Sequence, residues 1–378
     1  MGAHQKWCAL FIRENIMTYL IDSHEDIAYN ALSFNRDICV SAQTTRLKEK
    51  DTDIPKWNYG SATLGWPEYQ HGKVALIFAT IFVAPALYSG SSWEVMTYHN
   101  SNEAEKFMGM QFDYYHRLVE DHPTKFQLVS NLNELKNVLH PWENGEAGEH
   151  PVGLVLSLEG AEGLQSPNQL EDYYARGLRL VGPVWAGNRY CGGTKEDRPF
   201  DREGYALLEV MSSLGIPLDI SHMNERAALT ALDSFEGPVF ASHANAIALI
   251  KGSTSPRHLT DNVIHRLQER GGVAGVIPYN KFLINDWASS LPRENVPLAK
   301  VAAQIDYYCQ LSGNSNLVGI GSDFDGGFGY PNIPLELETI ADLQKLGPIL
   351  AKMGYTAEEI NNIFHINWKK HLENILPE

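Results

Sequence analysis

The stretch Val152–Glu159 has the sequence VGLVLSLE, a largely apolar run that ends in a carboxylate. Continuous apolar runs of this length are typical of parallel strands that are covered on both faces. A carboxylate buried at the end of such a run needs a partner, because an unpaired charge is costly away from water. The stretch therefore predicts a central parallel strand that delivers Glu159 to a polar site.

Seven further apolar or β-branched runs alternate along the chain with stretches of helical periodicity. The predicted strands lie at residues 19–23, 74–84, 178–184, 216–220, 239–242, 273–278 and 317–321, with 126–130 as a candidate for one more. The predicted helices lie at residues 93–120, 167–175, 202–214, 225–235, 261–270, 298–311 and 335–352. Eight strands that alternate with helices favour an α/β protein with a (β/α)8 TIM barrel over an open sheet.

The length of 378 residues is compatible with two or three domains or with one α/β barrel. Because no repeat or Pro/Ser-rich linker divides the chain, we expect a single barrel domain over residues 17–378. Residues 1–16 are predicted to be a loose N-terminal extension, and residues 48–72 an irregular insertion. The stretch 356–376 predicts a C-terminal helical hairpin that Thr356 caps through a Thr-x-x-Glu pattern.

The composition excludes several classes of partner. Lys and Arg number 30 and Asp and Glu number 46, and the net charge of −16 argues against nucleic acid and anionic membrane surfaces. The longest apolar run, about 14 residues at 74–87, is too short to span a bilayer. Four widely spaced cysteines without a CxxC pair argue against a cysteine metal site. They also fit a reducing compartment, and since no signal peptide is evident, a cytoplasmic location is expected.

Histidines and carboxylates follow five of the predicted strands at the same end. The segments are His24-Glu-Asp26, Glu159, Asp219-Ile-Ser-His222, His243 and Asp323-Phe-Asp325. Catalytic groups of such barrels lie at the carboxyl ends of the strands, so we expect these side chains to meet. Taken singly, each has a simpler explanation, such as a structural histidine or a turn aspartate.

All the simpler explanations would have to hold at once, and a binuclear metal site accounts for the set better. His24 and Asp26 then hold one divalent ion, His222 and His243 hold the other, and Glu159 bridges them. Imidazole and carboxylate ligands suit zinc and similar ions. Two such ions, about 3.5–4 Å apart, bind a shared water and lower its pKa, which gives hydroxide at neutral pH.

The ordered motifs resemble the membrane dipeptidase (renal dipeptidase) family over about residues 17–376. They are His24-Glu-Asp26, Ser157-Leu-Glu159-Gly-Ala-Glu-Gly, Asp219-Ile-Ser-His222, Ser242-His243-Ala-Asn, Arg257-His-Leu-Thr-Asp261 and Gly321-Ser-Asp323-Phe-Asp325-Gly. The resemblance implies a metal-dependent hydrolase barrel with two zinc ions. Its expected substrates are dipeptides, including some with a D-residue on the C-terminal side, and some β-lactam-like amides. It is also compatible with a homodimer.

The resemblance extends to residues outside the metal site. It implies that Arg257 binds the terminal carboxylate of the substrate, a group that a guanidinium holds bidentately. Tyr279 matches a tyrosine that contacts substrate, and Asp323 matches a carboxylate near the substrate amine, where it accepts and returns a proton. Without the resemblance, Arg257 would be assigned to the surface and Tyr279 to the core.

Trp185 departs from the family pattern. Mammalian members have a histidine after the corresponding strand, where it helps to polarise the scissile carbonyl. An indole N–H donates one hydrogen bond but does not titrate, and losing one oxyanion donor typically costs about 10²–10³ in rate. Either Trp185 or Arg189 replaces the histidine, or the substrate is another amide or lactam. A non-catalytic barrel that binds metal or a small molecule is a third alternative.

Overall fold

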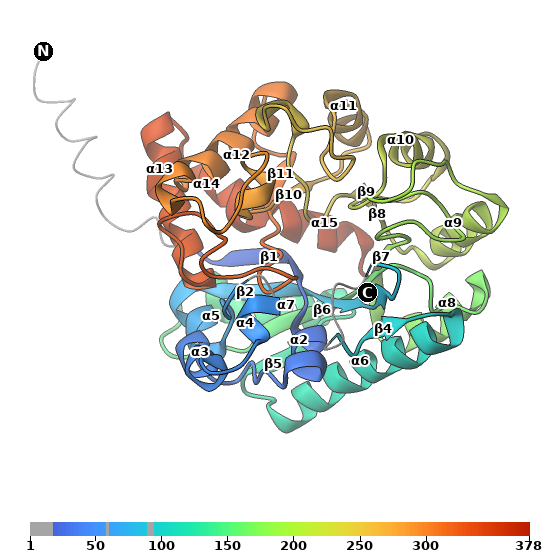
Figure 1. Cartoon of the computed structure of the whole chain (residues 1–378), viewed down its shortest axis with the longest axis horizontal. Coiled ribbons are helices and arrows are strands. Elements are labelled where there is room, and N and C mark those ends of the chain that lie inside the picture. Colours follow the sequence, from blue (N-terminus) through green and yellow to red (C-terminus); the bar gives the residue numbers. More distant parts are fainter. Residues whose placement is uncertain (1–17, 58–59, 89–93) are drawn as a thin grey trace, which may run out of the picture.

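The computed structural model describes residues 18–57, 60–88 and 94–378 (Figure 1). Its centre is a nearly closed barrel of eight parallel strands in the order β10-β11-β1-β2-β6-β7-β8-β9. The strands are β1 (Leu20–Glu25), β2 (Val74–Phe82), β6 (Val152–Glu159), β7 (Leu178–Gly182), β8 (Leu218–Asp219), β9 (Val239–Phe240), β10 (Ala274–Val276) and β11 (Val318–Ile320). This order confirms the predicted (β/α)8 barrel.

The two ends of this strand order meet just after β9. Ala241 pairs with Ala274 in a parallel bridge, with Ala241 N donating to Val273 O at 2.8 Å. The candidate strand at 126–130 is confirmed as β5 (Phe126–Leu128), which pairs with the beginning of β6. A separate short pair is formed by β3 (Ala84–Pro85) and β4 (Thr97–Tyr98).

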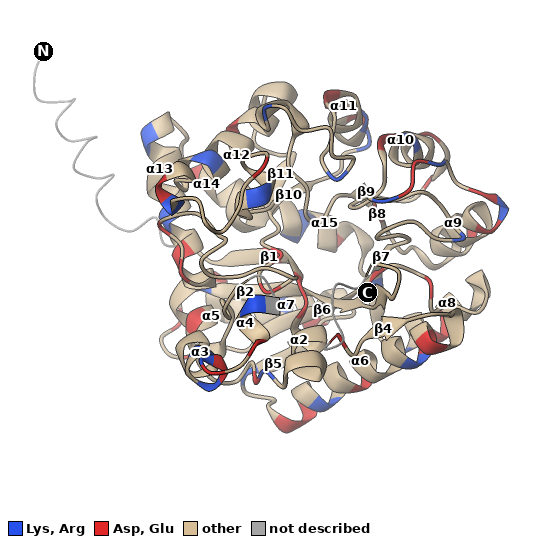
Figure 2. Ribbon diagram, viewed as in Figure 1, with Lys and Arg blue, Asp and Glu red and all other residues tan. Residues whose placement is uncertain are grey.

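Helices surround the strands, and many charged residues lie on these helices and on the loops between them (Figure 2). They are α2 (Ile27–Phe34), α3 (Ala42–Glu49), α4 (Ile54–Trp57), α5 (Trp66–Gly72), α6 (Ser101–Asp121), α7 (Leu132–Glu143), α8 (Leu170–Ala175), α9 (Arg202–Leu214), α10 (Glu225–Ser234), α11 (Asp261–Glu269), α12 (Ala299–Ser312), α13 (Leu346–Met353), α14 (Ala357–Asn361) and α15 (Asn367–Ile375). Side-chain caps begin several of them, as at Asn224 and Thr260, which accept from backbone amides three residues on. None of the helices described combines the length and apolar character that a bilayer-spanning segment requires.

The predicted C-terminal hairpin is wrong. Thr356 does form a capping box with Glu359, but helix α14 runs through a π-helical turn at Asn362–Ile366 directly into α15. No glycine or proline occurs between Ala357 and Ile375, so nothing in this stretch ends the helix.

Three other segments differ from expectation. The helix expected at 335–352 is a 3-10 helix at Ile340–Lys345 that continues into α13. The 48–72 insertion is only partly irregular, because it contains α4 and α5, and a proline within the first turn of α5 suits a helix start. The helix expected at 93–120 begins at Ser101, where Asn100 caps it; Trp93 lies outside the described residues. The predicted extension at residues 1–16 also lies outside them.

The C-terminal helix packs into the barrel through Trp368. This side chain is fully buried, and its Nε1 donates to Ile320 O of β11 at 3.0 Å. Its ring meets Phe78 of β2 and Phe240 of β9 edge-on, with centroids 5.3 and 6.1 Å away. Gly319 makes room for it, because a Cβ there would lie 2.2 Å from the indole nitrogen. Trp368 therefore joins three strands that are far apart in the sequence.

Truncating Trp368 should destabilise the whole barrel. We expect Trp368→Ala to lower the free energy of unfolding by about 3–5 kcal/mol, because it leaves a large cavity among packed rings. Denaturant unfolding followed by fluorescence and circular dichroism measures the change. The exposed Lys370 on the same helix gives a control, since Lys370→Ala should change stability by less than about 0.5 kcal/mol. Equal effects of the two substitutions would contradict this role of Trp368.

Candidate metal and substrate site

The carboxyl ends of five barrel strands bring the predicted polar residues together. The six residues that meet there are His24 at the end of β1, Asp26 just after it, Glu159 ending β6, His222 after β8, His243 after β9 and Asp323 after β11. All six are buried. They lie close together because neighbouring parallel strands end at the same rim of the barrel.

Glu159 lies at the centre of this cluster. Its Oε2 is 3.4 Å from His24 Nε2, while its Oε1 is 2.8 Å from His222 Nε2 and 3.5 Å from His243 Nε2. The Nε2 atoms of His222 and His243 are only 3.0 Å apart. Asp26 Oδ2 approaches His24 Nε2 to 3.9 Å. One carboxylate is thus surrounded by three imidazoles whose Nε2 atoms point at a common centre.

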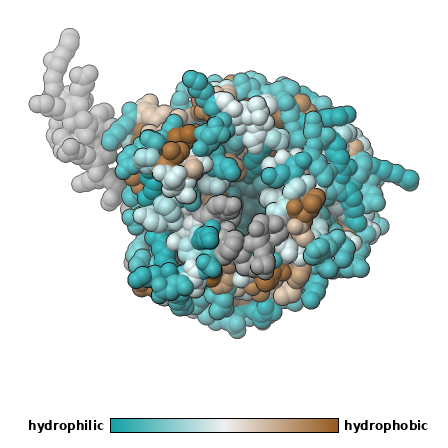
Figure 3. Space-filling view, viewed as in Figure 1, coloured by the Kyte–Doolittle hydropathy of each residue, from teal (hydrophilic) through white to brown (hydrophobic). Residues whose placement is uncertain are grey.

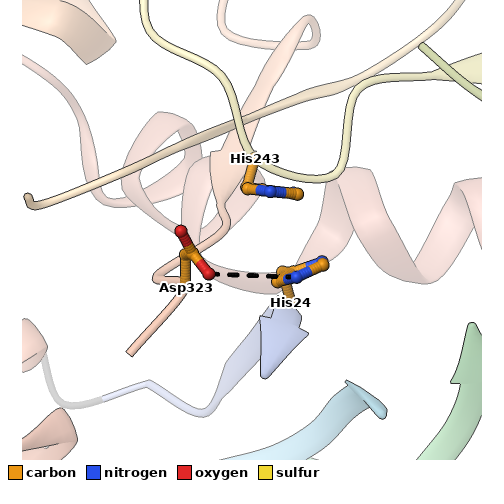
Figure 4. Close-up of side chains that lie close together, drawn as sticks. All are labelled: His24, His243 and Asp323. Carbon is orange, nitrogen blue, oxygen red and sulfur yellow. Dashed lines mark ion pairs between the residues drawn. The ribbon is translucent and has the colours of Figure 1, made fainter. Parts of the chain in front are cut away.

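Asp323 faces the same centre from the loop after β11. Figure 4 shows its carboxylate directed at the ring of His24, with Oδ1 3.9 Å from Nε2, and the His243 ring stacked on His24. The backbone of Asp323 is left-handed, with φ 55°, a conformation that non-glycine residues seldom adopt. Gly326 allows the close approach, because a Cβ there would lie 2.0 Å from Asp323 Oδ1 and 2.9 Å from Asp26 Oδ2.

Hydroxyl groups fix the orientation of the rings. Thr194 Oγ1 lies 3.0 Å from His222 Nδ1, and Ser242 Oγ lies 2.7 Å from His243 Nδ1. The Ser242 hydroxyl donates its proton to the buried carboxylate of Asp219, so it accepts from His243 Nδ1–H. His243 therefore presents the lone pair of Nε2 to the cluster, as metal-binding histidines do.

Burial and neighbouring charges set the protonation of the cluster. Burial and the charge of Arg257 lower the pKa of His222 to about 4, and burial also holds the pKa of His243 well below its usual range. Burial raises the pKa of Asp26 to about 7. Burial opposes the charging of His24, but nearby carboxylates, first that of Glu159, outweigh it and raise the pKa to about 10. A proton on His24 thus takes the place that a cation would occupy among these acids.

The donor set fits divalent metal ions. Three overlapping groups have ligand atoms within 4.8 Å of one another: His24, Asp26 and Glu159; His24, His243 and Asp323; and Glu159, His222 and His243. Among the described residues, the buried atom Asp26 Oδ1 has no hydrogen-bond partner. Imidazole and carboxylate side chains are ligands that zinc and similar ions prefer, and a bound ion would take the place of the proton on His24.

A cavity of about 420 Å³ opens next to the cluster; the molecular surface in Figure 3 is hollowed near its centre. Arg257 lines this cavity and is only 2% exposed. Its Nη2 donates to His243 O at 2.7 Å, whereas Nε and Nη1 have no partner within the described parts of the chain. Tyr279 forms a neighbouring wall, stacked on Phe328 at 4.1 Å between centroids. A buried guanidinium with free donors is a site for an anion.

Trp185 lines another wall of the cavity together with Phe82 and Tyr88, whose ring centroids lie 5.5 and 6.4 Å from its own. Its ring is 6.0 Å from that of His222, so it borders the cluster. Arg189 does not, since its Nε pairs with Glu203 Oε2 at 3.1 Å and it is absent from the cavity lining. Of the two proposed substitutes for the family histidine, only Trp185 lies at the site.

The sequence did not reveal the hydroxyl partners of the rings. Ser242 adjoins His243 in the sequence, but Thr194 belongs to the loop after β7 and reaches a histidine 28 residues away. Asp219 stood out in the Asp-Ile-Ser-His222 segment without a role. The structure gives it one, since it accepts from the amides of Ser221 and Ser242 at 2.9 Å each.

Comparisons with known proteins identify the family of the chain. The model of the membrane dipeptidase family (peptidase family M19) matches residues 13–375. An uncharacterized protein from the pqqA 5′ region of Klebsiella pneumoniae is 32% identical over 234 residues, which are 59% of this chain and 82% of that protein. Dipeptidase verJ of Clonostachys rogersoniana is 24% identical over 369 residues, which are 94% of this chain and 84% of that protein.

A solved structure shows the same fold. The metallopeptidase of Rhodobacter sphaeroides liganded with a phosphinate mimic of the dipeptide L-Ala-D-Ala has a TM-score of 0.74 at 21% identity. The match covers 95% of this chain and 99% of that one. With a family model that spans nearly the whole sequence, the chain belongs to the membrane dipeptidase family of metallopeptidases.

Proposed function

We propose that the protein is a zinc-dependent dipeptidase that hydrolyses the peptide bond of free dipeptides, L-D dipeptides included. One observation carries the proposal: the buried histidine–carboxylate cluster and the free donors of Arg257 line the same cavity. The cavity volume of about 420 Å³ suits a small ligand. The dipeptide mimic bound by the Rhodobacter sphaeroides relative supports the inclusion of a D-residue.

The residues that would hold two zinc ions are those of the cluster. His24 and Asp26 would bind one ion, His222 and His243 the other, with Glu159 between them. When bound, such ions lower the pKa of a shared water and polarise a carbonyl oxygen. The protein contributes fixed ring orientations and a buried setting, in which electrostatic interactions are stronger than in water.

Arg257 is suited to hold the C-terminal carboxylate of the substrate. Its Nη2 is fixed by the carbonyl of His243, so the free Nε and Nη1 are held next to the cluster. A substrate anchored there by its end places the peptide bond at a set distance from the cluster. Such an anchor restricts cleavage to a peptide bond near the C-terminal end of the substrate.

Asp323 is suited to transfer the proton from the attacking water to the leaving amine. Burial raises the pKa of its carboxyl well above the usual range, against the opposing charge of His24, so its carboxylate is a stronger base than that of a free aspartate. It can take a proton from the attacking water and return it to the leaving amine. Trp185 supplies an N–H from the opposite wall that can donate to the developing oxyanion, with Tyr279 shaping the substrate pocket.

Removing metal should abolish dipeptide hydrolysis. We expect purified protein to contain about two zinc ions per chain and to lose amino-acid release after chelation, with recovery on adding zinc. Metal analysis paired with a panel of L-L and L-D dipeptides measures both. Hydrolysis that persists in protein shown to be metal-free would contradict the proposal.

Removing the guanidinium of Arg257 should abolish the preference for a substrate with a free C-terminal carboxylate. We expect Arg257→Met to lower kcat/KM about 10- to 100-fold, the size of hydrogen bonds to a charged group. The matched measurement uses the same dipeptide with an amidated C-terminus. The unmodified protein should prefer the free acid, and the variant should not. A variant that keeps the full preference would rule out this role of Arg257.

The indole N–H of Trp185 should matter more than its ring. We expect Trp185→Phe to lower kcat about 10²-fold with little change in KM, because the ring still packs on Phe82 but the donor is gone. Tyr88→Phe removes a polar group from the same wall and should leave kcat near its original value. Equal kcat values of the two variants would show that Trp185 only lines the cavity and donates no hydrogen bond to the oxyanion.

Trp185 stands where mammalian members of the family have a histidine. This replacement also favours a second candidate function, a hydrolase of the same type that acts on a different amide or a lactam. The panel therefore includes a β-lactam. Faster turnover of the lactam than of any dipeptide would favour this candidate.

A further inference from the structure

A buried side chain outside the metal cluster joins two of its loops. Asn30 on α2 is 4% exposed, and its Nδ2 donates to Asp26 O and to Asp325 O, at 2.9 Å each. Asp26 belongs to the loop after β1 and is one of the cluster carboxylates. Asp325 follows Asp323 by two residues in the loop after β11. One amide group thus bridges the two loops that carry Asp26 and Asp323.

Arg36 fixes the orientation of this amide. Its Nη1 donates to Asn30 Oδ1 at 3.0 Å, and since a guanidinium only donates, the NH₂ group of Asn30 must face the two carbonyls. Arg36 is itself held by Glu49, with Nε–Oε1 and Nη2–Oε2 distances of 2.7 and 3.0 Å. Its Nη1 also lies 3.4 Å from Asp325 Oδ2. All members of this network are buried.

The 48–72 insertion supports the same loop from the other side. Asp325 Oδ1 accepts from Thr63 N and Thr63 Oγ1 at 2.8 and 2.7 Å. Beyond it, Ser61 and Tyr330 exchange two backbone hydrogen bonds, of 2.7 and 3.0 Å. The segment around Thr63 therefore lies along the outer edge of the loop that presents Asp323.

The loop needs this support because its backbone is strained. Asp323 and Asp325 have φ values of 55° and 62°, in the left-handed region. Non-glycine residues keep such conformations only where their surroundings over-determine them. One bond from Asn30 and two from Thr63 end on Asp325, two residues after Asp323, which must face His24.

We propose that Asn30, held by Arg36, is a positioning residue that sets the Asp26 and Asp323 loops relative to each other, and that Thr63 of the insertion completes the support. The inference rests on the proposed function, since it assigns these loops to metal binding and proton transfer. It predicts that losing the network loosens the metal site and misplaces Asp323, while Arg257, which is not part of it, still binds the substrate carboxylate.

The first test is the zinc affinity of the full chain, measured by competition with a chromophoric chelator. We expect Asn30→Leu to weaken zinc binding by about 10- to 100-fold, the usual effect of losing a partner that orients a ligand. Asn131→Leu is the matched control, because Asn131 caps α7 and touches neither loop. The control should lower the melting temperature but leave zinc affinity unchanged. Equal zinc affinities in Asn30→Leu and the unmodified protein would overturn the proposal.

Thr63 gives a milder variant that keeps the side-chain shape. Thr63→Val removes one hydrogen bond to Asp325, and we expect a lower kcat with an unchanged KM for a dipeptide. Thr63→Ser retains the hydroxyl and should restore kcat. A change in KM alone, or no rescue by serine, would count against the positioning role.

The outcomes separate this inference from the proposed function. Protein that binds zinc but cleaves no dipeptide would overturn the function alone, and the zinc affinities of Asn30→Leu and Asn131→Leu would still decide the role of Asn30. Protein that binds no zinc would overturn both.

Discussion

The burial of Glu159 among three imidazoles is the constraint on which the site depends. Its carboxylate lies within 3.5 Å of the Nε2 atoms of His24, His222 and His243. Burial opposes its charge, yet the charge of His24 holds its pKa well below the usual range. An anion in this position is stable only while positive charge stays beside it. The barrel satisfies this need by ending several strands at one place, which is also where a metal ion fits.

The order of the strands around the barrel places an aromatic side and a cationic side of the cavity opposite each other. Counting around the barrel, β2 lies opposite β9, so Phe82 at the end of β2 faces the segment after β9 that carries Arg257. The cluster lies between the aromatic side and the cationic side. Lys195 and Lys281 also line the cavity. Four acidic side chains line it too, so the cavity would attract a small anion chiefly when bound divalent ions offset the acids, in a chain of net charge −16 whose outer helices also display many acidic residues (Figure 2).

Much of this arrangement could be predicted from local sequence, and the contacts that were missed have a common cause. Apolar runs such as Val152–Glu159 locate the strands, and the strand-end rule brings His24 and Glu159 together, because both depend only on period and position. Asn30 and Thr63 could not be found this way. Their partners lie on loops about 260 to 300 residues away, so only the folded chain shows the contacts. The missed continuity of α14 and α15 has a different cause, since the absence of glycine and proline between them was already visible in the local sequence.

Trp185 illustrates how burial changes the meaning of a substitution. In water, replacing a histidine by tryptophan removes a group that titrates near neutral pH. Beside this cluster the comparison differs, because burial and the charge of Arg257 keep the neighbouring His222 neutral, with a pKa of about 4. A histidine at position 185 that stayed neutral would likewise donate one N–H hydrogen bond. An indole N–H offers the same single bond, and its ring is held by packing on Phe82. A fixed donor needs little reorganisation as charge develops, so the exchange preserves oxyanion stabilisation better than the loss of a titratable group suggests.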